Sequence, residues 1–264
     1  MGSSITSVIS PKWLAHAHEL FPVFESASPF PHLVLDDFLV EDQARAMLSE
    51  FPSEQSMPNS RDYVFAAKRE LSSIEGAGPA CLRFYQAVIS PEFTAFLGDL
   101  TGLELFVDPA FHGGGFHQGG DGSFLDMHVD FNIHPMHNDW RRMLNILVYL
   151  CPDWDPAWGG DLLIKRHVQD EPMVVPVGFN RAVIMRTADD TYHGFRRMQL
   201  PAGVTRKSVA TYAYELVGDR HIPAHTTRWV PEEAGAAKRA LARHYDAVVG
   251  WKQRLMPSRT AKNR

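Results

Sequence analysis

The spacing of apolar residues divides the chain into a helical first part and a strand-rich second part. Helical spacing appears over residues 11–24, where Pro22 should end the helix or lie just beyond it. It also appears over residues 41–51, where Pro52 ends the helix. Two further helices are predicted over residues 79–97, separated by Ser90-Pro91. Residues 29–39 predict an extended entry followed by a short strand.

From about Leu103 the apolar runs become short and are broken by Gly and Pro. They predict strands at 124–132, 141–150, 162–165, 173–177, 181–186 and 207–216. This spacing is typical of a jelly-roll sandwich, so the fold class is mainly β with flanking helices. Beyond Pro231, a helix is expected over about 231–256, because acidic residues open this stretch and basic residues close it.

Composition fits a single domain in three parts. The chain has 264 residues, of which 45% are hydrophobic and 22% charged, as in ordinary globular proteins. We therefore expect one domain over 1–264, with a helical part at 1–102, a jelly-roll core at about 103–217 and the C-terminal helix. A net charge of −5 favours neither a nucleic-acid nor a membrane partner. Two cysteines form no disulfide framework, which favours a cytoplasmic protein.

The candidate metal ligands begin with His128 and Asp130. Side chains at positions i and i+2 of a strand share a face, so these two lie roughly 6–7 Å apart along it. Two histidines and one carboxylate on one side of a metal form the facial triad of non-haem iron oxygenases. His193, which follows the apolar run 182–185, is the expected third ligand. His167 and His221 are the alternatives.

A candidate anion site lies further along the chain. Arg206 and Ser208 open a strand-like run and share a face. A guanidinium fork with a hydroxyl suits a carboxylate, because the fork can bind both oxygens. Arg186 and Arg197 are alternative anchors.

Taken in order, these motifs resemble the 2-oxoglutarate and iron(II) dependent dioxygenases, within them the prolyl-4-hydroxylase-like branch. The resemblance spans roughly residues 100–217. The residues that carry it are His128-x-Asp130, His193 and Arg206-x-Ser208, supported by 145–150, Trp154 and 159–162.

The resemblance implies a double-stranded β-helix (a cupin-like jelly roll) and a set of cofactors. Iron(II) would bind His128, Asp130 and His193, with O2 as oxidant and ascorbate as a further reductant. The co-substrate 2-oxoglutarate would chelate the iron, and Arg206 with Ser208 would hold its far carboxylate. Tyr149 takes the position of a family tyrosine that bonds this carboxylate; the alternative is a packed core tyrosine. Asn145 shares the face of Tyr149 and is a further candidate for cofactor binding.

The expected function is hydroxylation of an unactivated C–H bond in a small molecule, with release of succinate and CO2. An amino acid or a natural-product intermediate is the expected substrate. The alternatives are a peptidyl (prolyl-type) hydroxylase and a non-enzymatic cupin-like metal-binding protein. The C-terminal helix is expected to pack on the core, with a homodimer contact as its alternative.

The glycine-rich segment 112–122 predicts a flexible loop beside the active-site mouth, with a lid as one role. His112 and His117 within it are expected to be solvent-exposed or to contact substrate. The pair His134 and His137 is not expected to form a second metal site, because Pro135 disfavours a helix between them.

Overall fold

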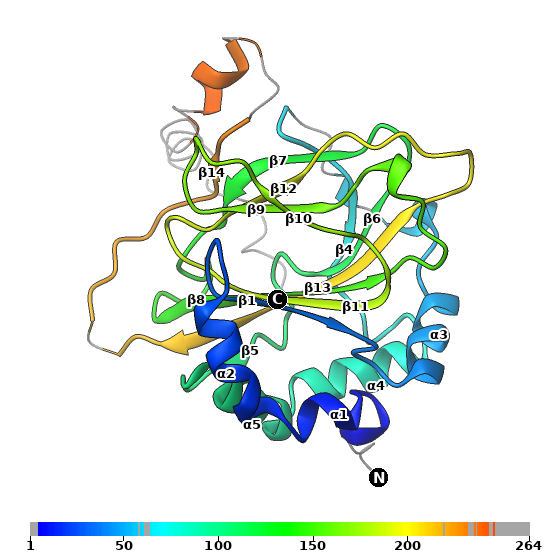
Figure 1. Ribbon diagram of the computed structural model, residues 1–264, viewed down its shortest axis with the longest axis vertical. Helices are drawn as coiled ribbons and strands as arrows, with labels where there is room; N and C mark the ends of the chain where they lie inside the picture. Colours follow the sequence, from blue (N-terminus) through cyan, green and yellow to red (C-terminus); the bar gives the residue numbers. More distant parts are fainter. Residues whose placement is uncertain are drawn as a thin grey trace, which may run out of the picture.

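The computed structural model describes residues 5–57, 59–60, 64–218, 220–231, 235, 237–242 and 245. Two antiparallel β-sheets face each other, and the helices gather against the outer face of one of them (Figure 1). This is the mainly β, jelly-roll architecture predicted from the sequence. No helix in the described part of the chain has the length and apolar character needed to cross a membrane.

The larger sheet has the strand order β1-β11-β8-β13-β6-β4-β2, with β5 beside β13. Its strands are β1 (His32–Asp36), β2 (Asn59–Ser60), β4 (Arg69–Leu71), β5 (Phe106–Val107), β6 (Gly115–Gly119), β8 (Trp140–Leu150), β11 (Phe179–Arg186) and β13 (Arg206–Leu216).

The smaller sheet has the order β10-β9-β12-β7-β14, with β3 beside β7. Its strands are β3 (Ala66–Ala67), β7 (Phe124–Val129), β9 (Leu162–Lys165), β10 (Met173–Val175), β12 (Tyr192–Phe195) and β14 (Arg228–Trp229). Both sheets therefore take strands from the first hundred residues as well as from the later part of the chain.

Helices cover the outer face of the larger sheet and bury its apolar side chains (Figure 1). They are α1 (Pro11–Leu14), α2 (Ala17–Ser26), α3 (Glu41–Ser49), α4 (Pro79–Val88) and α5 (Pro91–Thr101). The main core joins them to alternate residues of β8, namely Leu144, Ile146, Val148 and Leu150. Since neighbouring strand residues point to opposite faces, Asn145, Leu147 and Tyr149 point into the space between the sheets.

The predicted helix over 11–24 is divided in two, and Pro22 does not end it. Pro22 lies inside α2, which continues to Ser26. A proline inside a helix removes one backbone hydrogen bond. Here the extra turn buries Phe24 completely, and the Ser26 hydroxyl donates to the Pro22 carbonyl, so packing outweighs the lost bond.

The glycine-rich segment is not the flexible loop that the sequence predicted. Residues 115–119 form β6, a fully buried strand between β4 and β13. A Cβ on Gly115, whose φ is +94°, would lie 2.2 Å from the Leu71 carbonyl oxygen. A Cβ on Gly114 would lie 2.5 Å from the carbonyl oxygen of Ala210. Glycine is needed here because two neighbouring backbones approach this segment closely.

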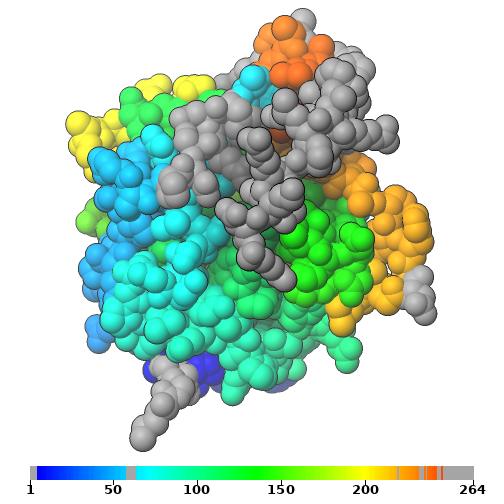
Figure 2. All heavy atoms as spheres, turned by 180° about the vertical axis from the view of Figure 1, so that it is seen from behind, coloured from blue at the N-terminus to red at the C-terminus, as the bar shows by residue number. Residues whose placement is uncertain are grey.

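The described residues near the C-terminal end lie at the surface of the molecule, in orange in Figure 2. The predicted C-terminal helix over 231–256 falls largely outside the described residues, which are helical at 237–242.

Cys81 and Cys151 are buried free thiols, consistent with the absence of a disulfide framework.

Asn180 ties the N-terminal segment to β11. Its backbone φ is +56°, and its side chain is buried. The Leu39 N–H donates to Asn180 Oδ1 at 2.8 Å, and Asn180 Nδ2 donates to the Leu39 carbonyl at 2.8 Å. The amide thus completes two backbone hydrogen bonds that no strand pairing supplies.

We predict that Asn180→Ala lowers the free energy of unfolding by roughly 2–4 kcal/mol, because two buried backbone groups lose their partner. Denaturant unfolding followed by circular dichroism measures this change. The exposed Gln199→Ala should change stability by less than about 0.5 kcal/mol. Equal stabilities of the two variants would contradict this role for Asn180.

Candidate active site

A pocket of about 140 Å³ lies between the two sheets. The larger sheet lines it with alternate residues of its two central strands. These are Asn145, Leu147 and Tyr149 from β8 and Arg206, Ser208 and Tyr212 from β13. Period-two alternation therefore supplies this part of the pocket wall, while the intervening residues face the helices.

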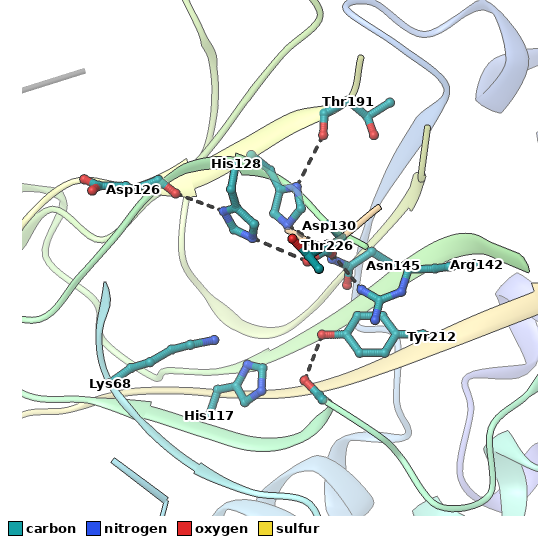
Figure 3. Close-up of polar contacts among 12 residues, drawn as sticks. Lys68, His117, Asp126, His128, Asp130, Arg142, Asn145, Thr191, Tyr212 and Thr226 are labelled. Carbon is teal, nitrogen blue, oxygen red and sulfur yellow. Dashed lines mark hydrogen bonds and ion pairs between the residues drawn. The ribbon is translucent and has the colours of Figure 1, made fainter. Parts of the chain in front are cut away.

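The three predicted metal ligands meet at this pocket. His128 lies near the end of β7, Asp130 just beyond it, and His193 in β12, directly opposite His128 in the strand pairing. Asp130 Oδ1 is 3.5 Å from His128 Nε2, and Asp130 Oδ2 is 3.5 Å from His193 Nε2. The ligand atoms of the three side chains thus converge on one point. Figure 3 shows His128 directed toward Asp130.

Hydrogen bonds turn both imidazoles toward that point. His128 Nδ1 lies 2.9 Å from the Asp126 carbonyl, and His193 Nδ1 lies 3.5 Å from the Thr191 carbonyl. A carbonyl can only accept, so Nδ1 carries the proton and Nε2 is left with a lone pair for a metal. Burial, and next the nearby His128, lower the pKa of His193 to about 3, so its ring is neutral at pH 7.

The donor set fits a divalent metal ion. Ligand atoms with bonds of about 2.1 Å to one ion lie roughly 3 Å apart at adjacent octahedral positions. The observed separations of 3.5 Å are close to this, and all three residues are buried. Within the described ranges, no other group of three or more His, Cys, Asp or Glu side chains has this geometry.

The other histidines considered from the sequence lie elsewhere. His167 and His221 are exposed and do not line the pocket. His134 is buried with Nε2 3.4 Å from Asp108 Oδ2, and His137 stacks on Trp140. His112 is exposed, whereas His117 lines the pocket.

Arg142 was not identified as a site residue from the sequence, yet it contacts the metal-binding carboxylate. Its Nη1 lies 2.9 Å from Asp130 Oδ2, and its side chain is completely buried. The guanidinium lies between the rings of Phe131 and Tyr212, 3.7 and 3.6 Å from their centroids. Such stacking on two aromatic faces suits the planar guanidinium.

The charge of Arg142 keeps Asp130 ionised. Burial alone would raise the pKa of Asp130, but Arg142, followed by His193 and His128, holds this pKa well below its usual value. The carboxylate is thus ready to bind a metal at neutral pH. Asn145 adds a neutral contact, with Nδ2 3.3 Å from Asp130 Oδ2. The structure therefore places Asn145 beside the metal ligands.

Arg206 stands at the other end of the pocket with Tyr149. Its Nη2 donates to the Tyr149 hydroxyl oxygen at 3.0 Å, and its Nε donates to the Gly160 carbonyl at 2.7 Å. The guanidinium also lies over the Phe195 ring, 4.3 Å from its centroid. Burial raises the pKa of Tyr149, so its hydroxyl stays protonated and can donate to an anion.

Gly160 lets Arg206 reach this position. Its φ is +80°, and a Cβ there would lie 3.2 Å from Arg206 Cδ and 2.5 Å from Met198 Sδ. The Gly-Gly sequence thus leaves room for the Arg206 side chain. The alternative anchors lie away from the pocket, since Arg186 pairs with Glu25 and Arg197 donates to the Gly122 carbonyl.

Trp229 closes the pocket beside the metal ligands and was also missed from the sequence. It lies in β14, which pairs with β7, and its ring stacks on His128 with centroids 4.8 Å apart. Phe65 also stacks on Trp229, with ring centroids 5.1 Å apart. A strand of two residues carries too little pattern to be predicted.

Comparison with known proteins agrees with this geometry. Residues 114–214 match the family model of the 2OG-Fe(II) oxygenase superfamily. This segment contains the three metal ligands together with Arg142, Asn145, Tyr149, Arg206 and Ser208. No curated protein matches the chain by sequence.

Several solved structures share the fold. A Pseudomonas putida prolyl-4-hydroxylase is 18% identical with a TM-score of 0.55, over 75% of this chain and 98% of that one. A Trichoplax adhaerens prolyl hydroxylase, in complex with a hypoxia inducible factor peptide, is 12% identical with a TM-score of 0.54, over 77% and 90%. HygX from Streptomyces hygroscopicus, with nickel, 2-oxoglutarate and hygromycin B bound, is 14% identical with a TM-score of 0.52, over 76% and 87%.

The family match covers both ends of the pocket, and the fold around it is that of the prolyl-4-hydroxylase-like enzymes. The donor set fits the iron(II) that this superfamily requires. In its matched segment, its donor set and its fold, the chain is therefore similar to the 2-oxoglutarate and iron(II) dependent dioxygenases of the 2OG-Fe(II) oxygenase superfamily.

Proposed function

We propose that the protein hydroxylates an unactivated C–H bond of a small molecule. In this reaction R–H, O2 and 2-oxoglutarate give R–OH, succinate and CO2, so one oxygen atom enters each organic product. The observation that carries the proposal is the pocket between the sheets, about 140 Å³ in volume and lined on several walls by buried charged groups. A small polar substrate suits such a space. HygX, which shares the fold, holds the small molecule hygromycin B in its structure.

When bound, iron(II) and 2-oxoglutarate supply the oxidising chemistry. The chain's own residues supply ligation, orientation and a dry pocket. His128, Asp130 and His193 would hold the iron, and Arg142 keeps Asp130 ionised and fixed.

Arg206 and Tyr149 would hold the far carboxylate of 2-oxoglutarate, with Ser208 beside them. A guanidinium and a phenol hydroxyl that contact each other offer several donors to one anion. Leu147, Leu162 and Phe195 line this end and limit its contact with water, which strengthens the electrostatic interactions within.

The proposal is tested by incubating the iron(II)-loaded protein with 2-oxoglutarate and panels of amino acids, other metabolites and proline-containing peptides. We expect small molecules to stimulate succinate formation and to gain 16 mass units, the mass of one oxygen atom, by mass spectrometry. Stimulation and hydroxylation of peptides alone would contradict a small-molecule substrate and identify a peptidyl hydroxylase. Absence of succinate with every compound would contradict the oxygenase activity itself.

Arg206→Ala should weaken 2-oxoglutarate binding. Loss of a buried charged partner costs roughly 2–5 kcal/mol, so the half-saturating 2-oxoglutarate concentration should rise by one or more orders of magnitude. Arg197→Ala is the matched control, because Arg197 lies outside this pocket. An unchanged concentration dependence in Arg206→Ala would assign the anchor to another residue.

Arg142→Met should destabilise the metal-free protein. Removing one partner of a buried ion pair leaves the other charge uncompensated, at a cost of roughly 3–5 kcal/mol in the free energy of unfolding. Arg141→Met on the same strand is the control, since Arg141 is partly exposed and should cost about 1 kcal/mol or less. Denaturant unfolding of both metal-free variants measures the difference. Equal losses of unfolding free energy in the two variants would contradict a stabilising role for the contact between Arg142 and Asp130.

A further inference from the structure

A second group of buried charges lines the pocket opposite the metal ligands. It consists of Lys68, which directly precedes β4, Glu70 in β4 and His117 in β6. Lys68 Nζ lies 2.9 Å from Glu70 Oε1, and His117 Nε2 lies 3.8 Å from the same oxygen. Figure 3 shows Lys68 and His117 across the space from His128, with the lysine ammonium directed inward. We call these three side chains the head-group cluster.

The strand pairing fixes the position of this cluster. Glu70 lies opposite His117 between β4 and β6, and His117 lies opposite Ser208 between β6 and β13. Because all three strands belong to the same sheet, side chains at paired positions point to the same side. The cluster therefore faces the same space as the proposed co-substrate anchor, one and two strands away from it.

Fold stability is a poor explanation for burying the Lys68–Glu70 ion pair. The side chains of Lys68 and Glu70 are only 14% and 9% exposed. Removing two charges from water costs several kcal/mol for each ion, and apolar replacements for a buried ion pair are often neutral or stabilising. The iron site and the Arg206 end use neither residue. Charged groups that are buried at a pocket wall without such a use point to ligand binding.

The charges around the pocket indicate the kind of ligand. Arg142 and Asp130 carry opposite charges, as do Lys68 and Glu70. Arg206 contributes one further positive charge. The two positive charges of iron(II) and the two negative charges of 2-oxoglutarate cancel, so together they add no net charge. A pocket with this surplus positive charge disfavours a cationic ligand and favours a zwitterion or an anion.

We propose that the head-group cluster binds the ammonium and carboxylate groups of a free α-amino acid. Glu70 accepts hydrogen bonds from the substrate ammonium, Lys68 donates to the substrate carboxylate, and His117 adds a polar contact beside them. The amino-acid side chain, neutral or acidic, then extends toward His128, Asp130 and His193. This inference rests on the proposed small-molecule hydroxylation and narrows it to one substrate class.

The first test changes the substrate and leaves the protein intact. Free L-amino acids are compared with their N-acetyl and C-amide derivatives on the anaerobic complex with iron(II) and 2-oxoglutarate. A shift in the visible charge-transfer absorption of this complex reports substrate binding, and product mass reports hydroxylation after oxygen is added. We expect a free neutral or acidic amino acid to bind at least tenfold more tightly than either derivative. Equal binding of the derivatives would overturn the inference.

The second test changes the cluster. Lys68→Met and Glu70→Gln should each raise the half-saturating amino-acid concentration tenfold or more, since each removes a charged partner of the head group. The exposed Lys12→Met, which removes an ion pair with Asp37, is the control and should leave it unchanged. Circular dichroism verifies that each variant is folded. Glu70→Asp keeps a carboxylate, so it should bind the amino acid more tightly than Glu70→Gln does. Wild-type affinity in both cluster variants would contradict the proposal.

The two proposals fail in different ways. If the protein shows neither the charge-transfer absorption nor succinate formation, the result contradicts the oxygenase activity itself. Succinate and hydroxylation with a small molecule that lacks an amino-acid head group would leave the proposed function standing and reject the head-group cluster as its binding site.

Discussion

The burial of charge between two sheets is the constraint on which this site depends. Ions in a space with little water are costly unless each meets an opposite charge or strong hydrogen-bond partners. Asp130 meets Arg142, Glu70 meets Lys68, and Arg206 meets the Tyr149 hydroxyl and the Gly160 carbonyl. The pairing leaves the metal-binding carboxylate ionised and the arginine fork in place before any ligand arrives. Preorganisation of this kind lowers the cost of binding, because few groups need to be ordered.

This burial of charge is possible because the two faces of each strand have different surroundings. The helices bury one face of β8, so its alternate residues can form an apolar core while Asn145 and Tyr149 face the pocket. β7 and β12 belong to the facing sheet and bring His128 and His193 together by direct pairing. The metal ligands thus come from one sheet, while the side chains that hold Asp130 and the proposed anion anchor come from the other.

Periodicity within single strands made part of this site predictable. An even difference in position places two strand residues on the same face, so a shared face could be predicted from sequence alone. This holds for His128 with Asp130, Asn145 with Tyr149, and Arg206 with Ser208. The jelly-roll class followed from short apolar runs broken by Gly and Pro. His193 was expected as the third ligand because it follows the apolar run 182–185, and the family resemblance supported that assignment.

Features that depend on distant partners were missed. Arg142 looks like an ordinary polar strand residue until the turn after Asp130 brings the carboxylate back against it. The segment that begins β6 looks like a loop in the sequence, because the Ala210 and Leu71 backbones require glycine at Gly114 and Gly115. Trp229 covers His128 from a two-residue strand far along the chain. In each case a contact between remote segments overrides the local propensity.

The most direct test of the account measures the fate of 2-oxoglutarate in the presence of iron(II) and oxygen. Succinate is followed by NMR in parallel with oxygen uptake, and metal content is measured on the same samples. The account predicts one iron(II) per chain and iron-dependent formation of succinate with consumption of oxygen. It also predicts that His193→Ala, which lacks one of the three ligands, is folded but inactive. Full turnover by His193→Ala, or a folded and iron-loaded wild-type protein that forms no succinate, would contradict it.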